Sequence, residues 1–394
     1  MKRMCLSLIG DICFPEEFKQ IFTLDGKFLI TRSLGSDCCF EMSGESMFYA
    51  LCEIEKSQKE SLFDYKLSII EAIDRRIIWG NGKLLHRSFT GDYDIQFRST
   101  NSALRTLLYA CEDGFDTDKN IRIIANEQFK YFFEWKEGIW FCHDSSEYGG
   151  KTPFSHIRSK VAGKSWRNTL TLNTHIDSLN TLLLLKFYRK EYLLNFDLDY
   201  WINKGLISIN QLLGLTNKGK IMNKLQEIDN YCLNLFLKEQ HNSFWIDCVY
   251  EKIVHPIIFK LVFPTVFFNN GFISRDLSVL NRHIDYQLVN IVDFARLLSL
   301  YKKNRETEIL TASILNYNEI EDRLERAIEF VESNKYLLNY IQSSDLQRAW
   351  YAEMYYAMSN INSKYIKIAQ NLYSDQLYCS ESPFYKLDFL NEKN

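Results

Sequence analysis

The sequence predicts a mainly α-helical protein folded as an α/α toroid of five to six helical hairpins, and three observations predict it. The chain has only 16 Gly and 5 Pro, so it offers few of the tight turns that an all-β sandwich needs. From about Gly44 onward, apolar residues recur with a period near 3.6. Helices that are apolar on nearly all sides alternate with one-faced amphipathic helices, as buried and outer layers should. A helical solenoid and an irregular α bundle are the structural alternatives.

The N-terminal residues 1–43 are expected to form short strands, and the helical domain is expected to occupy residues 44–394. The stretches MCLSLIGDICF and KFLITRSL have strand-like patterning, and an Asp-Gly turn leads into the second. Two insertions, near residues 135–166 and 241–283, break the helical pattern, and each is expected to contain strands. Because long insertions in a compact domain are usually functional, we expect the site there.

The helices are expected mostly in pairs. The first pair is expected from apolar residues within 47–73 that fall on one face of each helix. A Gly-Asn-Gly loop ends this pair. Later helices are expected over residues 99–111 with 121–132, 173–188 followed by 198–215, 221–235, 286–301 with 320–331, and 345–359 with 362–373. The stretches LNTLLLLKFY, YQLVNIVDFARLLSLY and AWYAEMYYAM are apolar nearly all round, whereas ASILNYNEIEDRLERAIEFVES is apolar on one face.

Charge, cysteines and hydropathy exclude several classes of protein. The net charge is −3 and no Lys/Arg-rich run accompanies an aromatic stripe, so no nucleic acid is expected as a partner. The 10 cysteines include no CxxC pair and are expected to be reduced. The N-terminal residues do not read as an export signal. The most apolar later stretch, residues 253–268, contains His255, Lys260 and two prolines, so no membrane insertion is expected. The sequence therefore predicts a cytoplasmic protein.

The segment GIWFCHDSSEYGG, residues 138–150, holds the densest group of side chains capable of chemistry. An aromatic strand is expected at its start. It leads directly into acid, base and hydroxyl groups, which are His143, Asp144, Glu147 and Tyr148. This run is the first candidate for a catalytic site.

The segment LNTHIDSLN is the expected companion of that run. It should place His175 and Asp177 in the first turn of a buried helix, which Asn173 or Thr174 can cap. A histidine at a helix start loses basicity and can stay neutral, which suits proton transfer near neutral pH. The alternative is that His175, and the histidine of the first run, are hydrogen-bonded core residues.

The segment GDYDIQFRSTNSALR brings charges to another apolar helix. Asp92 and Asp94 precede this helix, and Arg98 and Arg105 lie within it. Buried charges need partners, so these groups either bind a substrate or form a structural network of carboxylates and arginines. Glu353, on a later helix that is apolar nearly all round, poses the same choice.

With buried helices alternating with amphipathic ones, the chain resembles the α/α-toroid enzymes of carbohydrate chemistry. Within that group, the segments WFCHDSSEY and LNTHIDSLNTLLLL resemble uronate polysaccharide lyases and glucuronyl C5-epimerases. The resemblance implies an enzyme that abstracts the proton beside a carboxylate with Tyr, His or Glu. His143 or Tyr148 would then be the acid or base, and Glu147 is a further candidate for a catalytic role. His175 and Asp177 would orient the reacting groups.

The same resemblance implies a site for a glycan. Arg98 would neutralise a sugar carboxylate, and Trp140 and Trp166 would stack on sugar faces. The residues expected to bind substrate are Asp92, Asp94, Arg98, Trp140, Trp166, Asp144 and Glu353.

Two other functions stay open on the residues. A glycoside hydrolase would use paired carboxylates, Asp94 or Asp144 with Glu353, on either side of the bond. A non-catalytic helical protein would bind a partner in an aromatic groove. The acids and histidines named above could ligate a metal, but none has a zinc spacing such as HExxH, so no metal is expected. No Gly-rich phosphate loop, GxSxG or GxGxxG stands in the sequence, so no cofactor is expected, and the partner is a glycan or small molecule. The sequence leaves the oligomeric state open.

Overall fold

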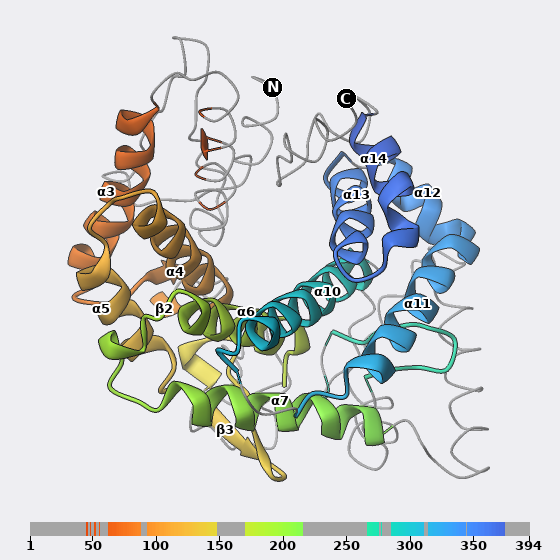
Figure 1. Ribbon diagram of the computed structural model, residues 1–394, viewed down its shortest axis with the longest axis horizontal. Helices are drawn as coiled ribbons and strands as arrows, with labels where there is room; N and C mark the ends of the chain where they lie inside the picture. The colour runs from red at the N-terminus through yellow and green to blue at the C-terminus, as the bar shows by residue number, and fades with distance from the viewer. Residues whose placement is uncertain are drawn as a thin grey trace, which may run out of the picture. The chain divides into compact units, whose positions relative to one another are not determined.

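The computed structural model describes residues 62–87, 93–147, 170–215, 266–275, 277, 285–310, 314–343 and 345–374. It also describes five earlier residues in helical conformation, which are Glu45, Phe48, Leu51, Cys52 and Glu55. This part of the chain is mainly α-helical and carries two small antiparallel sheets, as expected for the fold class (Figure 1).

The described part of the chain contains ten α-helices, four strands and three short 3₁₀ helices. The helices are α3 (Phe63–Trp79), α4 (Phe97–Glu112), α5 (Asp118–Gln128), α6 (Leu172–Phe187), α7 (Leu198–Gly214), α10 (Asp285–Glu306), α11 (Tyr317–Ser333), α12 (Lys335–Ser343), α13 (Asp345–Ser359) and α14 (Ile366–Ser374). The strands are β1 (Leu85–Arg87), β2 (Tyr93–Ile95), β3 (Phe132–Trp135) and β4 (Gly138–Phe141). Strand β1 pairs with β2, and β3 pairs with β4, both antiparallel.

The described residues fall into two compact units. Unit 1 takes its residues from Met1–Tyr131, Thr181–Leu198 and Ser344–Asn394. Unit 2 takes its residues from Phe132–Asn180 and Asp199–Ser343. Helix α6 therefore supplies its first half to unit 2 and its second half to unit 1.

In unit 1, helix α4 packs against α3 and α5. Leu104, Leu107 and Leu108 of α4 are fully buried, as are Ile121 and Ala125 of α5. Helix α13 packs against α14 in the same unit. The predicted pairing of residues 99–111 with 121–132 and of 345–359 with 362–373 is therefore confirmed.

In unit 2, the β3–β4 hairpin and the first half of α6 both pack against α7. The Ser208 hydroxyl of α7 donates a hydrogen bond to the Ile139 carbonyl of β4. A Cβ at Gly138 would collide with Ser208 and with the α7 backbone, and a Cβ at Gly205 would collide with Leu179 of α6. Glycine at these two positions lets the hairpin and α6 approach α7 closely.

Helix α10 contacts helix α6, the loop that precedes α10 and helix α11 in unit 2. Asn180 Nδ2 of α6 donates to the Asp293 carbonyl at 3.1 Å. The Gln287 side chain accepts from the Ile273 N–H at 2.8 Å and donates to the Gly271 carbonyl at 3.0 Å, so it satisfies the backbone of the loop before α10. Helix α10 also packs on α11, which confirms the predicted pairing of residues 286–301 with 320–331.

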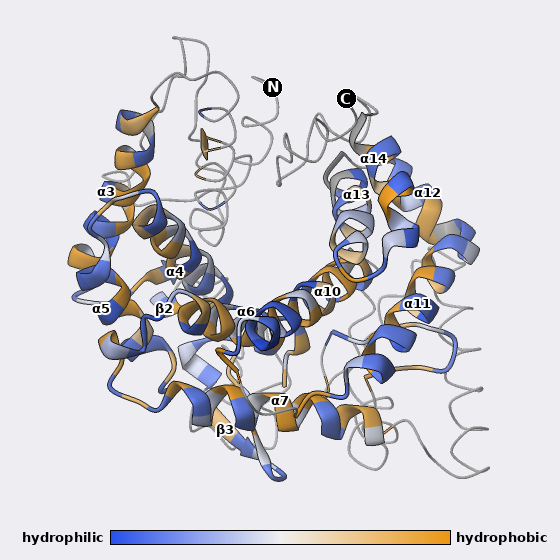
Figure 2. Cartoon of the chain, in the orientation of Figure 1, coloured by the Kyte–Doolittle hydropathy of each residue, from blue (hydrophilic) through white to orange (hydrophobic). Residues whose placement is uncertain are grey.

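Burial alternates along the helices as the sequence predicts. Helices α4, α6, α10 and α13 are buried on nearly every side over most of their length, whereas α3, α5, α7, α11 and α14 bury one side. In Figure 2, hydrophilic residues in blue and hydrophobic residues in orange alternate along the ribbon of α11. Among the described helices, none combines the length and the hydropathy that crossing a lipid bilayer requires.

Some expected elements differ from the structure. Residues 129–132 were expected to be helical, but α5 ends at Gln128 and Phe132 begins strand β3. Phe132 pairs with Phe141 across a hairpin whose turn carries Lys136 at φ +53°, and these long-range pairs outweigh the helical spacing. The β1–β2 hairpin and α12 were not expected. The strand expected in the first insertion is seen as β4, whereas the described residues of the second insertion show only an isolated antiparallel bridge between Phe267 and Ile273. The strands expected in residues 1–43 and the helix expected at 221–235 lie outside the described residues.

Candidate functional site

The candidate site in unit 2 is built where the loop after β4 meets the first turn of α6. The loop runs from Cys142 to the short 3₁₀ helix Ser145–Glu147. His143 in this loop is half-buried, and its Nδ1 lies 2.7 Å from the Oγ1 of Thr174 in α6. Thr174 is fully buried. This contact joins two segments 31 residues apart in the chain.

Two buried carboxylates hold the loop that carries His143. Glu147 has no exposed surface, and its Oε2 accepts a hydrogen bond from the His143 N–H at 3.2 Å. Asp144 Oδ1 accepts from the Ser146 N–H at 3.1 Å and from the Ser146 hydroxyl. The Asp144 carbonyl accepts from the Glu147 N–H. The backbone and ring of His143 are thus fixed from two sides.

His175 lies next to Thr174 in α6 but packs into the core. Its ring stacks on Trp140 with centroids 4.5 Å apart, and its Nδ1 accepts from the Phe141 N–H at 3.2 Å. Burial lowers the pKa of His175 to about 3, and the nearby Gly205 backbone opposes only part of this shift. This low pKa agrees with the expected neutral ring, but its cause is complete burial rather than the helix start.

Trp140 and Cys142, on either side of Phe141, also belong to the core. Trp140 has no exposed surface and meets Trp135 edge-on at 5.4 Å, in addition to its stacking on His175. Because Trp140 has no exposed surface, a sugar could stack on it only after the surrounding core rearranged. Burial, and then the neighbouring Asp144 carboxylate, raise the pKa of the Cys142 thiol well above its usual value.

Helix α6 carries a buried polar stripe that starts at the His143 contact. Thr174, Asp177, Ser178 and Thr181 follow one another at helical spacing and are all buried. The predicted site residue Asp177 is thus on the same stripe as Thr174, and only about 2% of it is exposed. The stripe is polar although it is shielded from bulk water, which is unusual for a helix core.

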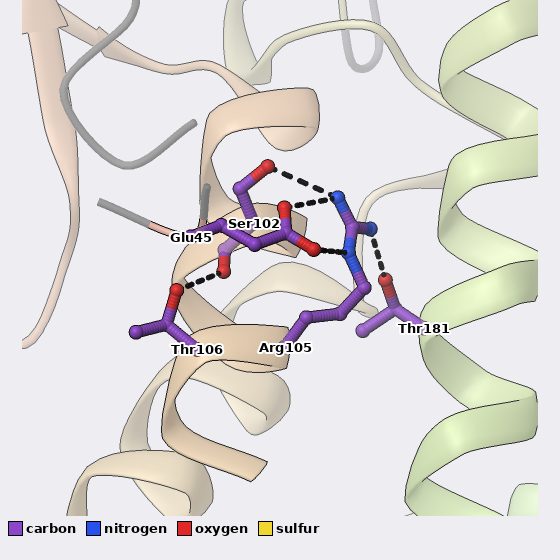
Figure 3. A network of polar contacts seen from close by, with 5 residues as sticks. All are labelled: Glu45, Ser102, Arg105, Thr106 and Thr181. Carbon is purple, nitrogen blue, oxygen red and sulfur yellow. Dashed lines mark hydrogen bonds and ion pairs between the residues drawn. The ribbon is translucent and has the colours of Figure 1, made fainter. Parts of the chain in front are cut away.

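In unit 1, Arg105 is the centre of a second polar network (Figure 3). Its guanidinium binds the Glu45 carboxylate through two parallel hydrogen bonds of 2.6 and 2.9 Å. It also donates to Thr181 Oγ1 at 2.9 Å and to Ser102 Oγ at 3.0 Å. For Arg105 the structural-network alternative therefore holds, because a carboxylate of the chain itself neutralises the arginine.

The remaining predicted residues are distributed as follows. Asp94 lies in β2 opposite His86, Arg98 lies half-buried in the first turn of α4, and Glu353 is about 1% exposed in α13. These three belong to unit 1, whereas the His143 cluster belongs to unit 2. The predictions for Asp92, Tyr148 and Trp166 lie outside the described residues.

The sequence indicated Thr174 only as a helix cap and did not indicate its contact with His143. A hydroxyl at a helix start is a signal for capping, and nothing local shows that its partner is a histidine from a distant loop. No group of three or more His, Cys, Asp or Glu side chains in the described residues is arranged to hold a metal ion.

Comparison of the chain with models of known protein families, with curated proteins and with solved structures gave no match.

Proposed function

We propose that the chain is a carbohydrate-active enzyme that removes the proton beside the carboxylate of a uronate-containing glycan, as lyases and epimerases do. The observation that carries the proposal is the contact between half-buried His143 and buried Thr174. His143 is the acid–base group in this proposal.

The geometry supports a proton-transfer role because the imidazole is positioned in advance. The Thr174 hydroxyl fixes the orientation of the ring through Nδ1, and the Glu147 carboxylate fixes the main chain of His143. The imidazole ring exchanges protons with the substrate in this proposal. A group held in one orientation loses less entropy on reaching the reactive geometry, and histidine titrates near neutral pH.

The other predicted residues of unit 2 take supporting roles. Asp144 and Glu147 position the loop, His175 anchors the start of α6 through β4, and Asp177 orients groups from the polar stripe. The contributions of Asp94, Arg98 and Glu353 stay predictions from the sequence.

We also infer that the helices form an α/α toroid. The alternation of helices buried on nearly all sides with helices buried on one side supports it, together with the packed pairs α4–α5, α10–α11 and α13–α14.

Hydrogen exchange into a uronate glycan tests the proposal for lyases and epimerases together. The full chain is incubated in D₂O with a panel of uronate polysaccharides, and the products are analysed by mass spectrometry and NMR. Epimerisation replaces the C5 hydrogen by deuterium, and elimination produces an unsaturated uronate with strong ultraviolet absorbance. Reducing ends without deuterium or unsaturation would instead support a glycoside hydrolase. Glycan binding without any product would support a non-catalytic protein.

The matched variants are His143→Gln and Lys136→Ala. His143→Gln should lower turnover by about 10²-fold or more, because general acid–base catalysis contributes 10²–10⁴-fold. Lys136 is exposed in the β3–β4 turn, so Lys136→Ala should leave turnover unchanged. Equal turnover in both variants, with equal thermal stability, would refute the role of His143.

A further inference from the structure

Cys111, Asp118 and Lys190 form a cluster in unit 1 that the proposed carbohydrate chemistry does not use. Lys190 Nζ lies 2.9 Å from Cys111 Sγ and 2.9 Å from Asp118 Oδ1. The same Asp118 oxygen lies 4.0 Å from the sulfur. The cluster therefore brings into contact a nucleophilic sulfur, an amine nitrogen and a carboxylate that can accept a proton.

The backbone holds each member of this cluster in place. Cys111 is in the last turn of α4, and Asp118 is the first residue of α5. Lys190 follows the C-terminus of α6, where Arg189 adopts φ +53° and the backbone closes the helix with hydrogen bonds of the Schellman type. Tyr192 donates a hydrogen bond to the second oxygen of Asp118. The sulfur and the amine are thus held together by a fixed framework.

Exposure and charge determine which reagents can act here. Cys111 is half-buried, and the side chains of Asp118 and Lys190 are 35% and 12% exposed, so the cluster is partly open to solvent. Burial disfavours the charge on Lys190, but hydrogen bonds to Cys111 and Asp118 outweigh it and raise the pKa of the amine. The amine must therefore give up a proton before it can attack, and Asp118 is in contact to accept that proton.

We propose that Cys111 and Lys190 are a modification site at which hydrogen peroxide or another small peroxide drives formation of a sulfur–nitrogen cross-link. In the first step the Cys111 sulfur attacks a peroxide oxygen, the O–O bond breaks, and the thiol becomes a sulfenic acid with release of one water. Sulfenic acids condense with nearby nitrogen nucleophiles.

In the second step Lys190 passes one proton to Asp118, and its nitrogen attacks the sulfenic sulfur. The S–O bond breaks, and the departing hydroxide leaves as water with a second proton from the nitrogen. One thiol, one ammonium, one carboxylate and one peroxide thus give an S–NH bond, a carboxylic acid and two waters. The sulfur is oxidised by two electrons and the peroxide is reduced.

Peptide mass spectrometry of the full chain tests this site. The protein is treated with hydrogen peroxide, free thiols are capped, and the digest is searched for the peptides of Cys111 and Lys190 joined with the loss of two hydrogens. The joined peptides should appear with peroxide and disappear after dithiothreitol. Cys142, which is buried, should remain a thiol and serves as the internal control.

Two variants test the roles of the amine and the carboxylate. Lys190→Arg keeps the positive charge, and it should accumulate the Cys111 sulfenic acid, trapped with dimedone, without a cross-link. Asp118→Asn should form the cross-link at least several-fold more slowly. Circular dichroism checks that both variants are folded. The proposal is overturned if the wild-type chain gives an unmodified Cys111, or oxidised Cys111 that is not joined to Lys190, or if Asp118→Asn reacts at the wild-type rate.

Discussion

His143 contacts the first turn of α6 and His175 is part of that turn, yet the two histidines differ in what they can do. His143 is half-buried with its ring on Thr174, whereas His175 is fully buried against Trp140. The sequence presents both as histidines beside carboxylates. Only the fold distinguishes them, because burial depends on which distant segments cover a residue.

The buried His175 makes stability depend on pH in a defined window. Its pKa is about 3 in the folded chain, because of burial, against 6.5 for an exposed histidine. Between pH 3 and pH 6.5 the unfolded chain binds a proton that the folded chain does not. The stabilisation that comes from the neutral His175 is therefore fully present above about pH 6.5 and is lost as the pH falls toward 3. This one group should lower the free energy of unfolding by about 2 kcal/mol from pH 7 to pH 5.

His175→Phe is the variant that isolates this effect. Phe can keep the stacking on Trp140 but removes the acceptor for the Phe141 N–H, so the variant should lose roughly 1–2 kcal/mol at neutral pH. Its stability should then change less between pH 7 and pH 5 than that of the wild type. Urea titrations at each pH measure both differences. An unchanged pH dependence would mean that His175 is not the group responsible.

The Glu45–Arg105 pair predicts a second effect at single residues. Arg105 and Glu45 have side chains only 8% and 15% exposed, so removal of one partner leaves a poorly solvated charge. Glu45→Gln should lower the free energy of unfolding by at most about 3 kcal/mol, because solvent still reaches a small part of the pair. Replacing both partners, as Glu45→Gln with Arg105→Met, should cost less than the sum of the single changes. Additive losses in the double-mutant cycle would contradict the coupling.

At the scale of elements, the β3–β4 hairpin depends on close packing against α7. Gly138→Ala would place a methyl group against the Ser208 hydroxyl and 2.6 Å from the Lys204 carbonyl, so we expect a loss of about 1–3 kcal/mol. Gly214→Ala is the matched control, because no atom lies within 4 Å of its added Cβ. This control should be neutral or gain up to about 1 kcal/mol from helix propensity. Thermal unfolding followed by circular dichroism compares the two, and equal stabilities would contradict the packing argument.

Helices with a strong pattern were predictable and short elements were not. The sequence predicts a helix at residues 345–359, and α13 spans Asp345–Ser359. The wrong assignment of residues 129–132 arose because apolar spacing alone cannot distinguish the end of a helix from an aromatic strand. Strands β1 and β2 have three residues each, too few to show a period of two.

At the scale of the whole molecule, the chain passes between the two units several times. Unit 2 needs residues from both 132–180 and 199–343, because Ser208 bonds to Ile139 and Asn180 bonds to the Asp293 carbonyl. A fragment of residues 199–343 lacks β4 and α6. We therefore expect it to unfold without a cooperative transition, whereas residues 132–343 should retain one. Calorimetry of the two fragments distinguishes these outcomes, and a sharp transition in the shorter fragment would contradict the division.

The candidate site was predictable only in part for the same reason. The segment around His143 and the start of α6 were both indicated, because acids and histidines stand beside aromatic strands and helix caps in the sequence. The contact of His143 with Thr174 joins residues 31 positions apart, and the Arg105–Glu45 pair joins residues 60 apart. Local patterns contain no information on such distances, so the choice between catalytic and structural histidines required the fold.

Because α6 is one continuous helix, the chain should tolerate few insertions or deletions within it. Within unit 2, Thr174 contacts the His143 ring and Asn180 donates a hydrogen bond to the Asp293 carbonyl, and one uninterrupted helix sets the angle between these two side chains. An insertion or deletion of one codon between them would rotate one side chain by about 100° around the helix axis relative to the other. Both partners could not then be kept, so natural variation in this helix should consist of replacements at constant length.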